Sequence, residues 1–391
     1  MNFKISNRVS NLPSYLFAHL ENMKQKRVKE GYPVIDLSVG DPSFPTQSHI
    51  VEKMKEVLSE YETHRYPPFR GIDQLKITIS EWYKRRFGVD IDPEKEVLIL
   101  VGSKEGLSHI SLSYIDPGEI ALVPNPGYPA YAGGVALAGG EVEEIPLLEK
   151  NNFFPDFSNV SPRVAKKAKL MFLNYPNNPT GAVASVEDFE RAVEFAKKNN
   201  IIVAHDAAYS EVSFGNYVAP SFLKAKGAKE IGVEFHSFSK TFCMTGWRIG
   251  MVVGNAEVID NIAKTKAFVD SGVFGAIQKA ASFALDSYNE VPKEIKERYL
   301  ERMNILKRGL EPLGWEIQVP KAGYFIWVKV PNNNSSMEFC KMLLEKAGVL
   351  MTPGVGFGGY GEGFIRISLN VEEEQLHRAI KSINENIYIQ K

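Results

Sequence analysis

Lys240 has the sequence surroundings best suited to chemistry by an amine. It ends the run Ser237-Phe238-Ser239-Lys240, and Arg248 follows eight residues later. With average residue usage, this combination is expected by chance in a chain of this length on the order of one time in a hundred. Strand-like stretches lie on both sides of the run, so the lysine can be held away from water. The alternative is an exposed loop lysine, which is the usual state of this residue type.

Polar residues also follow two apolar runs earlier in the chain. Residues 174–181 read Asn-Tyr-Pro-Asn-Asn-Pro-Thr-Gly and follow the run 170–173, while Asp206 and Tyr209 follow the run 201–204. Ligands of open α/β sheets bind at the carboxyl ends of the strands. Each motif has a structural alternative, because Asn-Pro makes turns and an Asp after a strand often caps a helix. Their order together with Lys240 favours one shared site.

The elements that position these residues are short apolar runs alternating with helical or glycine-rich segments. This alternation predicts an α/β fold with a mainly parallel sheet covered by helices. The expected strands are residues 97–101, 120–123, 170–173, 201–204 and 249–253.

The two ends of the chain are expected to form a second, smaller α+β domain. A helix is predicted over residues 12–30, and a helical region follows residue 254 and is broken near Pro292. Strands are expected at residues 316–319, 324–330 and 364–369. The N-terminal segment has no core of its own, which predicts a large domain over residues 46–284 and a small domain from residues 1–45 with 285–391.

Composition excludes several classes of protein. The 391 residues carry 46 Lys and Arg against 47 Asp and Glu, so no global positive field favours nucleic acid or an anionic membrane. The two cysteines, Cys243 and Cys340, lie in no CxxC pair, which argues against a disulfide framework or a zinc site. No signal peptide and no apolar run long enough to cross a bilayer is visible, so we expect a cytoplasmic protein without bound metal.

The chain resembles the class I and II aminotransferases, which use pyridoxal 5'-phosphate on the fold type I scaffold of aspartate aminotransferase. The motif sequences are most similar to those of the branch that contains the LL-diaminopimelate aminotransferases and their aspartate-using relatives. The resemblance spans nearly the whole chain. It rests on residues 38–42, Tyr66 with Gly71, residues 102–106, 126–129 and 177–181, Asp206 with Tyr209, residues 237–240, Arg248 and Arg366.

The resemblance implies three catalytic residues. Lys240 would hold the cofactor as an imine and, once released, move a proton between the substrate Cα and the cofactor. Asp206 would pair with the pyridinium nitrogen and keep it protonated. Tyr209 and Asn178 would hydrogen-bond the ring oxygen, and Tyr128 would stack on the ring.

The same resemblance implies a phosphate site, shared between two subunits. Ser237 and Arg248 would bind the phosphate, while Ser103 and Lys104 open a helix whose N-terminal N–H groups suit an anion. Tyr66 would reach the phosphate of the neighbouring chain, which predicts a homodimer with shared active sites. The alternative for Tyr66 is a tyrosine in a hydrophobic loop.

For the substrates, the resemblance assigns Arg366 to the α-carboxylate, with Gly40 and Asn178 beside it. Lys104 could meet a distal carboxylate or serve only the phosphate. Arg70 could arrive from the partner or form only a surface ion pair. The expected reaction moves an amino group from an L-amino acid with a charged distal end, aspartate-like or diaminopimelate-like, to 2-oxoglutarate.

Other interpretations remain at this stage. A pyridoxal-phosphate-dependent β-lyase shares the scaffold, and a non-catalytic regulator would need a DNA-binding module for which the chain has neither length nor charge. Residues 354–359 match GxGxxG, but a strand follows them, which argues against a dinucleotide site. The charged stretch 290–302 is expected to be only a solvated helix face.

Overall fold

The computed structural model describes residues 3–13, 16–288, 291–331 and 335–387. Twelve strands are found in this part of the chain: β1 Ile35–Asp36, β2 Val97–Leu100, β3 Ile120–Asn125, β4 Glu141–Pro146, β5 Ala168–Asn174, β6 Ile202–Asp206, β7 Gly232–Ser237, β8 Gly250–Gly254, β9 Phe325–Lys329, β10 Val349–Leu350, β11 Thr352–Pro353 and β12 Phe364–Ser368. The α-helices are α1 Asn7–Ser10, α2 Leu16–Lys29, α3 Ser48–Val57, α4 Asp73–Phe87, α5 Ser103–Tyr114, α6 Ala130–Ala138, α7 Pro162–Lys167, α8 Val186–Asn199, α9 Ala228–Ile231, α10 Phe238–Thr241, α11 Ala256–Ala267, α12 Gly275–Asp286, α13 Lys293–Leu310, α14 Ser336–Met342 and α15 Glu373–Asn386.

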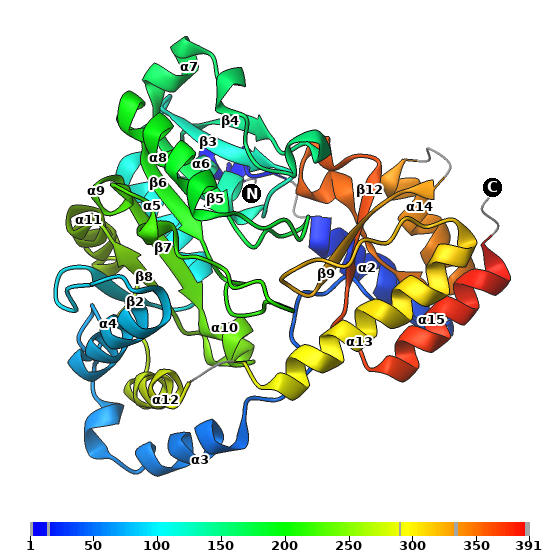
Figure 1. The fold of residues 1–391 in the computed structure, drawn as a ribbon, viewed down its shortest axis with the longest axis horizontal. Coiled ribbons are helices and arrows are strands. Elements are labelled where there is room, and N and C mark those ends of the chain that lie inside the picture. Colours follow the sequence, from blue (N-terminus) through cyan, green and yellow to red (C-terminus); the bar gives the residue numbers. More distant parts are fainter. Residues whose placement is uncertain (1–2, 14–15, 289–290, 332–334, 388–391) are drawn as a thin grey trace.

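A seven-stranded sheet in the order β2-β8-β7-β6-β5-β3-β4 forms the larger part of the molecule (Figure 1). β7, β6, β5, β3 and β4 pair in parallel, and β8 pairs antiparallel with both β2 and β7. The prediction of a mainly parallel sheet is therefore confirmed. β4 was not among the expected strands because its residues 141–144 are exposed and three of them are glutamates, as suits an edge strand.

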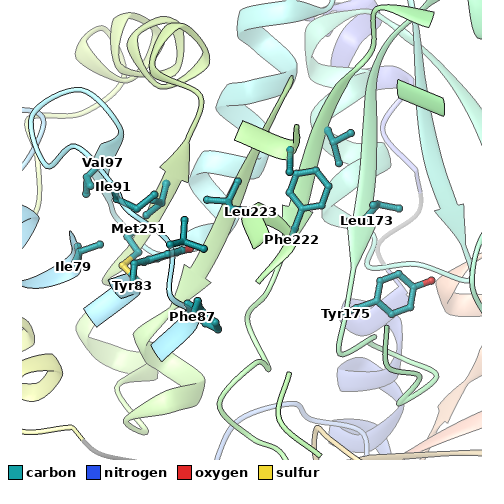
Figure 2. Close-up of a cluster of buried hydrophobic side chains, with 14 of the residues drawn as sticks. Ile79, Tyr83, Phe87, Ile91, Val97, Leu173, Tyr175, Phe222, Leu223 and Met251 are labelled. Carbon is teal, nitrogen blue, oxygen red and sulfur yellow. The ribbon is translucent and has the colours of Figure 1, made fainter. Parts of the chain in front are cut away.

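Helices cover both faces of this sheet. Val97 and Ile99 face a core that includes α4, α8 and α12, whereas Leu98 and Leu100 face α5, α6 and α11. Alternate residues of each strand thus enter two different cores, as the two-residue period of a strand requires. Figure 2 shows the first of these cores, where Tyr83 of α4 lies near Met251 of β8.

The smaller unit joins both ends of the chain. β9, β12 and β11 form an antiparallel sheet, and β1 pairs in parallel with β10. Leu20 of α2 packs against Leu344 and Leu350. The N-terminal segment therefore packs against the C-terminal region. The division into two domains, with boundaries at residues 45/46 and 284/285, stays a prediction.

Two expectations for this region were wrong. Residues 316–319 form no strand: Trp315 and Ile317 enter the core while Glu316 and Gln318 line a cavity, so the alternation reflects burial without strand pairing. The charged face of α13 is not merely solvated, because Arg302 is fully buried and donates to Glu373 of α15 at 3.0 Å.

Two further expectations, on residues 354–359 and on Pro292, agree with the structure. Residues 354–357 and 359–361 form 3₁₀ turns before β12, so GxGxxG opens no dinucleotide-type helix. Pro292 immediately precedes α13, as expected, and a second break lies between α11 and α12. Within the described residues, no helix has the length and apolarity needed to cross a membrane.

Candidate active site

A cavity of about 450 Å³ lies where the carboxyl ends of β3, β5, β6 and β7 meet β9 and β12. This is the position at which parallel sheets bind ligands. The cavity brings together nearly all of the predicted site residues, drawn from segments far apart in the sequence. They are Gly40, Ser103, Lys104, Tyr128, Asn178, Asp206, Tyr209, Ser237, Lys240, Arg248 and Arg366.

Lys240 enters the cavity from the short helix α10, directly after β7. Its Nζ donates to the carbonyl oxygen of Gly40 at 2.8 Å. Burial of the amine lowers the pKa of Lys240 to about 8, and the positive charges of Arg366 and Arg248 act in the same direction, although Asp41 opposes them. The amine is therefore available as a nucleophile and a base much closer to neutral pH than an ordinary lysine is.

Asp206 is the last residue of β6 and is held on several sides. Its Oδ2 accepts from the hydroxyl of Tyr131 at 2.9 Å, and its Oδ1 accepts from the backbone N–H of Ala208 at 3.2 Å. The side-chain amide of Asn174 donates to its backbone carbonyl at 2.7 Å. Burial raises the pKa of Asp206, while the Tyr131 hydrogen bond opposes that rise. The carboxylate has a fixed direction and gains from a cationic partner.

Arg366 on β12 is 2% exposed and has no carboxylate within ion-pair distance among the described residues. Its Nη1 donates to Oδ1 of Asn178 at 2.8 Å and its Nη2 donates to the carbonyl of Ser38 at 2.6 Å. Its Nε has no partner in the part of the chain that the structure describes. Burial lowers the pKa of Arg366 to about 10, so it remains a cation at neutral pH. A buried, unbalanced guanidinium of this kind is suited to receive an anion.

A second anion site is formed at the start of α5. Ser103 is the first residue of this helix, whose free N–H groups carry partial positive charge. Gly102 has φ +78°, and a methyl group there would overlap the Arg248 guanidinium. Ser237 at the end of β7 lines the same cavity. Because Gly102 has no side chain, the N-terminus of α5 and the Arg248 guanidinium can lie close enough to bind the same anion.

Aromatic residues define the walls between these groups. Tyr209 is buried with its ring 5.6 Å from that of Phe325, and burial raises the pKa of its hydroxyl. Tyr128 meets Tyr131 edge to face, and Nζ of Lys104 lies 5.9 Å from the centroid of the Tyr128 ring.

Two predicted residues lie outside this cavity. Tyr66 is 89% exposed and borders a different pocket, beside Pro67 and Pro68. Arg70 forms an ion pair with Asp260 at 3.3 Å and donates to two backbone carbonyls of its own chain, Glu94 and Lys95. Arg70 therefore forms the surface ion pair that was the alternative to a role in the partner's site.

The structure adds residues that sequence reasoning missed. Tyr131 contacts Asp206, and the cavity is also lined by Phe17, Glu21, Asn174, Ser239, Thr245 and Phe325. Ser239 and Thr245 lie inside the motif that was recognised, so position alone could have suggested them. Phe17 and Glu21 stand one helical turn apart on α2, and no local signal links that helix to the cavity.

The donor set fits pyridoxal 5'-phosphate. Lys240 would provide an amine for the aldehyde, Asp206 a carboxylate for the ring nitrogen, and Ser103, Ser237 and Arg248 a cradle for the phosphate. No group of three or more His, Cys, Asp or Glu that could hold a metal ion occurs in the described ranges.

Comparisons with known proteins agree with this chemistry. Residues 32–383 match the model of the family described as aminotransferase class I and II. The chain is 47% identical over 378 residues to an LL-diaminopimelate aminotransferase of Halothermothrix orenii, covering 97% of each protein. It is 48% identical over 376 residues to the enzyme of the same name from Moorella thermoacetica, covering 96% of each.

Solved structures show the same relationship. Substrate-bound BacF from Bacillus subtilis superimposes with a TM-score of 0.94 at 41% identity, over 98% of each chain. A single mutant of Thermus thermophilus aspartate aminotransferase gives a TM-score of 0.91 at 26% identity, over 98% of this chain and all of that one. The chain therefore belongs to the class I and II aminotransferases and is a transaminase that depends on pyridoxal 5'-phosphate.

Proposed function

We propose that this transaminase moves the α-amino group of an L-amino acid with a charged distal end to 2-oxoglutarate. The observation that carries the donor class is that Lys104 and Glu21, of opposite charge, line the same cavity as Arg366. Relatives that match nearly the whole chain are named for LL-diaminopimelate, whose far end carries both an ammonium and a carboxylate.

Residues of the cavity have distinct roles in this reaction. Arg366 binds the α-carboxylate through its guanidinium fork, and Asn178 orients that fork. Lys240 lies where it can hold the cofactor and then carry the proton to and from the substrate Cα. Asp206, aligned by Tyr131, keeps the ring nitrogen protonated. The bound cofactor supplies the electron sink that stabilises the carbanion formed at the substrate Cα.

The distal end of the donor would extend past Phe17 toward Glu21. The Arg366 guanidinium lies 5.6 Å from the Phe17 ring, and Glu21 follows one turn later on α2. Ion pairing with Lys24 lowers the pKa of Glu21 and keeps it anionic. A carboxylate here favours a distal ammonium, while Lys104 provides the complementary charge for a distal carboxylate.

The test is the kcat/KM of the donor half-reaction, followed as conversion of the bound cofactor to its amine form, for LL-diaminopimelate, glutamate and alanine with Glu21→Gln and Lys104→Met. We expect Glu21→Gln to lower the value for LL-diaminopimelate about 10-fold or more and to leave alanine nearly unchanged, because only the first donor has a distal ammonium. Lys104→Met should affect LL-diaminopimelate and glutamate more than alanine.

Glu30→Gln is the matched control, since Glu30 lies just after the same helix, pairs with Arg27 and does not line the cavity. Equal losses for all three donors in both variants would contradict the proposed donor class, leaving the phosphate as the partner of Lys104.

We also propose a homodimer with shared sites. Tyr66 does not line the cavity of its own chain. Its exposed side chain supports the proposal that it contacts the phosphate in the partner's site. Phe69 and Phe268 are also exposed, and Pro67 lies against Gly272 in the neighbouring loop. Large apolar side chains exposed in this way favour an interface.

A further inference from the structure

Behind the active site, three polar side chains interrupt an otherwise apolar face of the sheet. His205 on β6 pairs in register with Glu234 on β7, and His236 follows two residues later on the same face. His205 and Glu234 are fully buried and His236 is 5% exposed. Charged and polar groups are rarely placed so deeply unless they are fully hydrogen-bonded.

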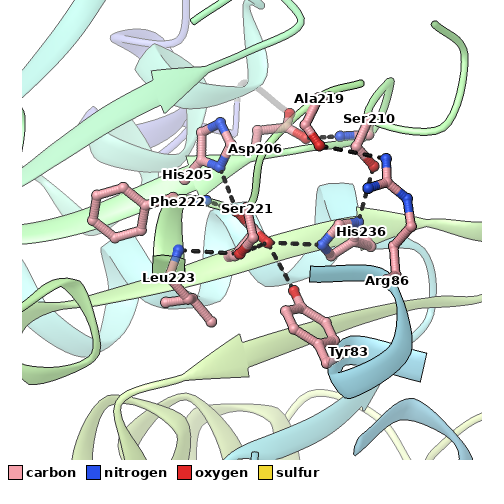
Figure 3. A network of polar contacts seen from close by, with 12 residues as sticks. Tyr83, Arg86, His205, Asp206, Ser210, Ala219, Ser221, Phe222, Leu223 and His236 are labelled. Atoms are coloured by element: carbon pink, nitrogen blue, oxygen red, sulfur yellow. Dashed lines mark hydrogen bonds and ion pairs between the residues drawn. The ribbon is translucent and has the colours of Figure 1, made fainter. Parts of the chain in front are cut away.

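The Glu234 carboxylate accepts five hydrogen bonds, several of which Figure 3 shows. Its Oε1 accepts from Tyr83 at 2.9 Å, from Ser221 at 2.8 Å and from Nε2 of His236 at 3.0 Å. Its Oε2 accepts from Nδ1 of His205 at 2.8 Å and from the backbone N–H of Phe222 at 2.6 Å. Burial alone would raise the pKa of Glu234, but the two histidine hydrogen bonds outweigh that effect and lower it well below its usual range. The group is a buried, fully satisfied anion.

The direction of the His205 bond follows from its other nitrogen. The backbone N–H of Tyr175 donates to Nε2 of His205 at 3.2 Å, so Nε2 is the acceptor and Nδ1 carries the proton toward Glu234. Glu234 therefore fixes the ring of His205 in one tautomer and orientation.

Each histidine directly precedes a residue of the cavity. His205 comes before Asp206 at the end of β6, and His236 comes before Ser237 at the end of β7. Because successive side chains of a strand point to opposite faces, anchoring each histidine behind the sheet aims the next residue into the cavity.

We propose that Glu234 is a positioning residue for transamination, which holds the ends of β6 and β7 in register so that Asp206 and Ser237 meet the cofactor's ring nitrogen and phosphate together. This inference rests on the cofactor placement proposed above. Glu234 touches neither cofactor nor substrate and acts through the two histidines.

The experiment measures the Kd of the apoenzyme for pyridoxal 5'-phosphate and for pyridoxal, together with the Tm. Glu234→Gln keeps the shape but turns an amide N–H₂ toward existing donors. It should weaken binding of both compounds about 10- to 100-fold, the range seen when groups behind ligating residues of metal sites are removed. Tyr83→Phe and Ser221→Ala each remove one donor that does not lead to the cavity, and they should lower Tm while preserving both Kd values.

Two further variants keep the test decisive if Glu234→Gln does not fold. His236→Asn should weaken pyridoxal 5'-phosphate more than pyridoxal, because only the former has the phosphate that Ser237 meets. His205→Asn should weaken both equally through Asp206. Folded variants at Glu234 or at both histidines with wild-type Kd values would overturn the inference. Failure of the wild-type protein to bind the cofactor would instead overturn the proposed site.

Discussion

At the residue scale, the site is defined by charges that the fold leaves unbalanced. Arg366 is buried among aromatic rings, with its guanidinium 4.2 Å from Phe325 and 4.8 Å from Phe357. Its hydrogen-bond partners within the described ranges are all neutral groups. Among the described residues, Lys240 has only the Gly40 carbonyl as its hydrogen-bond acceptor. Both residues were predictable because each lies in a short motif. Tyr131 was not, since its contact with Asp206 joins positions 75 residues apart.

The lowered pKa of Lys240 predicts how cofactor incorporation depends on pH. Below about pH 8 the amine is protonated and cannot attack an aldehyde, so the rate at which apoenzyme takes up pyridoxal 5'-phosphate should rise through about pH 8 and then level off. Stopped-flow absorbance from pH 6 to about pH 11 measures this rate. A midpoint near that of an ordinary lysine would show that the amine is not desolvated.

Arg366→Lys tests the role assigned to the guanidinium. The substitution keeps a positive charge but loses the two-pronged fork and the hydrogen bond to Asn178, so kcat/KM should fall about 30-fold or more for every donor. The loss should be the same for alanine and LL-diaminopimelate, since both carry the α-carboxylate. A loss confined to one donor would indicate that Arg366 binds the distal end of that donor and not the α-carboxylate.

At the scale of elements, apolar runs predicted the parallel strands well because those strands are buried on both faces. The edge strand β4 was not predicted because its exposed residues are mostly charged and form no apolar run. The Glu234 cluster could have been suspected from polar residues at alternate positions of an apolar strand, but its partners Tyr83 and Ser221 come from distant segments. Sequence periodicity reports burial, and it does not report which distant side chain meets a buried group.

Gly102→Ala tests the junction of β2 and α5. The substitution forces a positive φ on alanine and pushes a methyl group into Arg248, so it should both lower stability by about 1–3 kcal/mol and raise the Kd for pyridoxal 5'-phosphate. Gly88→Ala is the matched control, because Gly88 has φ +70° but an added Cβ meets nothing within 4 Å. It should lower Tm without changing the Kd. Equal Kd values in the two variants would contradict a role for Gly102 in shaping the phosphate site.

At the scale of the whole molecule, the unit formed by both chain ends lies beside the large sheet (Figure 1). Residues of both parts line the cavity. Phe17 and Glu21 reach it from α2, so the N-terminal segment contributes to the site and cannot be treated as a separate tail. One predicted residue, Tyr66, is exposed at a distance from the cavity, and a symmetric partner would explain its position.

Mixing two defective chains tests the shared site, with the residual activity of each variant alone subtracted. Tyr66→Phe and Lys240→Ala chains, exchanged in solution, should form hybrid dimers in which one site has both defects and the other has none. Activity should recover toward a quarter of the wild-type value when the chains mix randomly in equal amounts, as half of the dimers are hybrids with one intact site. Native mass spectrometry verifies the exchange. Proven exchange without recovery would contradict donation of Tyr66 across the interface.

The most direct test of the central claim is to locate the covalently held cofactor. The protein is saturated with pyridoxal 5'-phosphate, reduced with borohydride, digested and mapped by mass spectrometry, with Lys240→Ala treated in parallel. We predict one adduct on the peptide that contains Lys240, and no adduct at the corresponding position in the variant, which should still fold because Lys240 contributes little to packing. An adduct on another lysine, or equal labelling of the two proteins, would contradict the assignment of this cavity as the site of transamination.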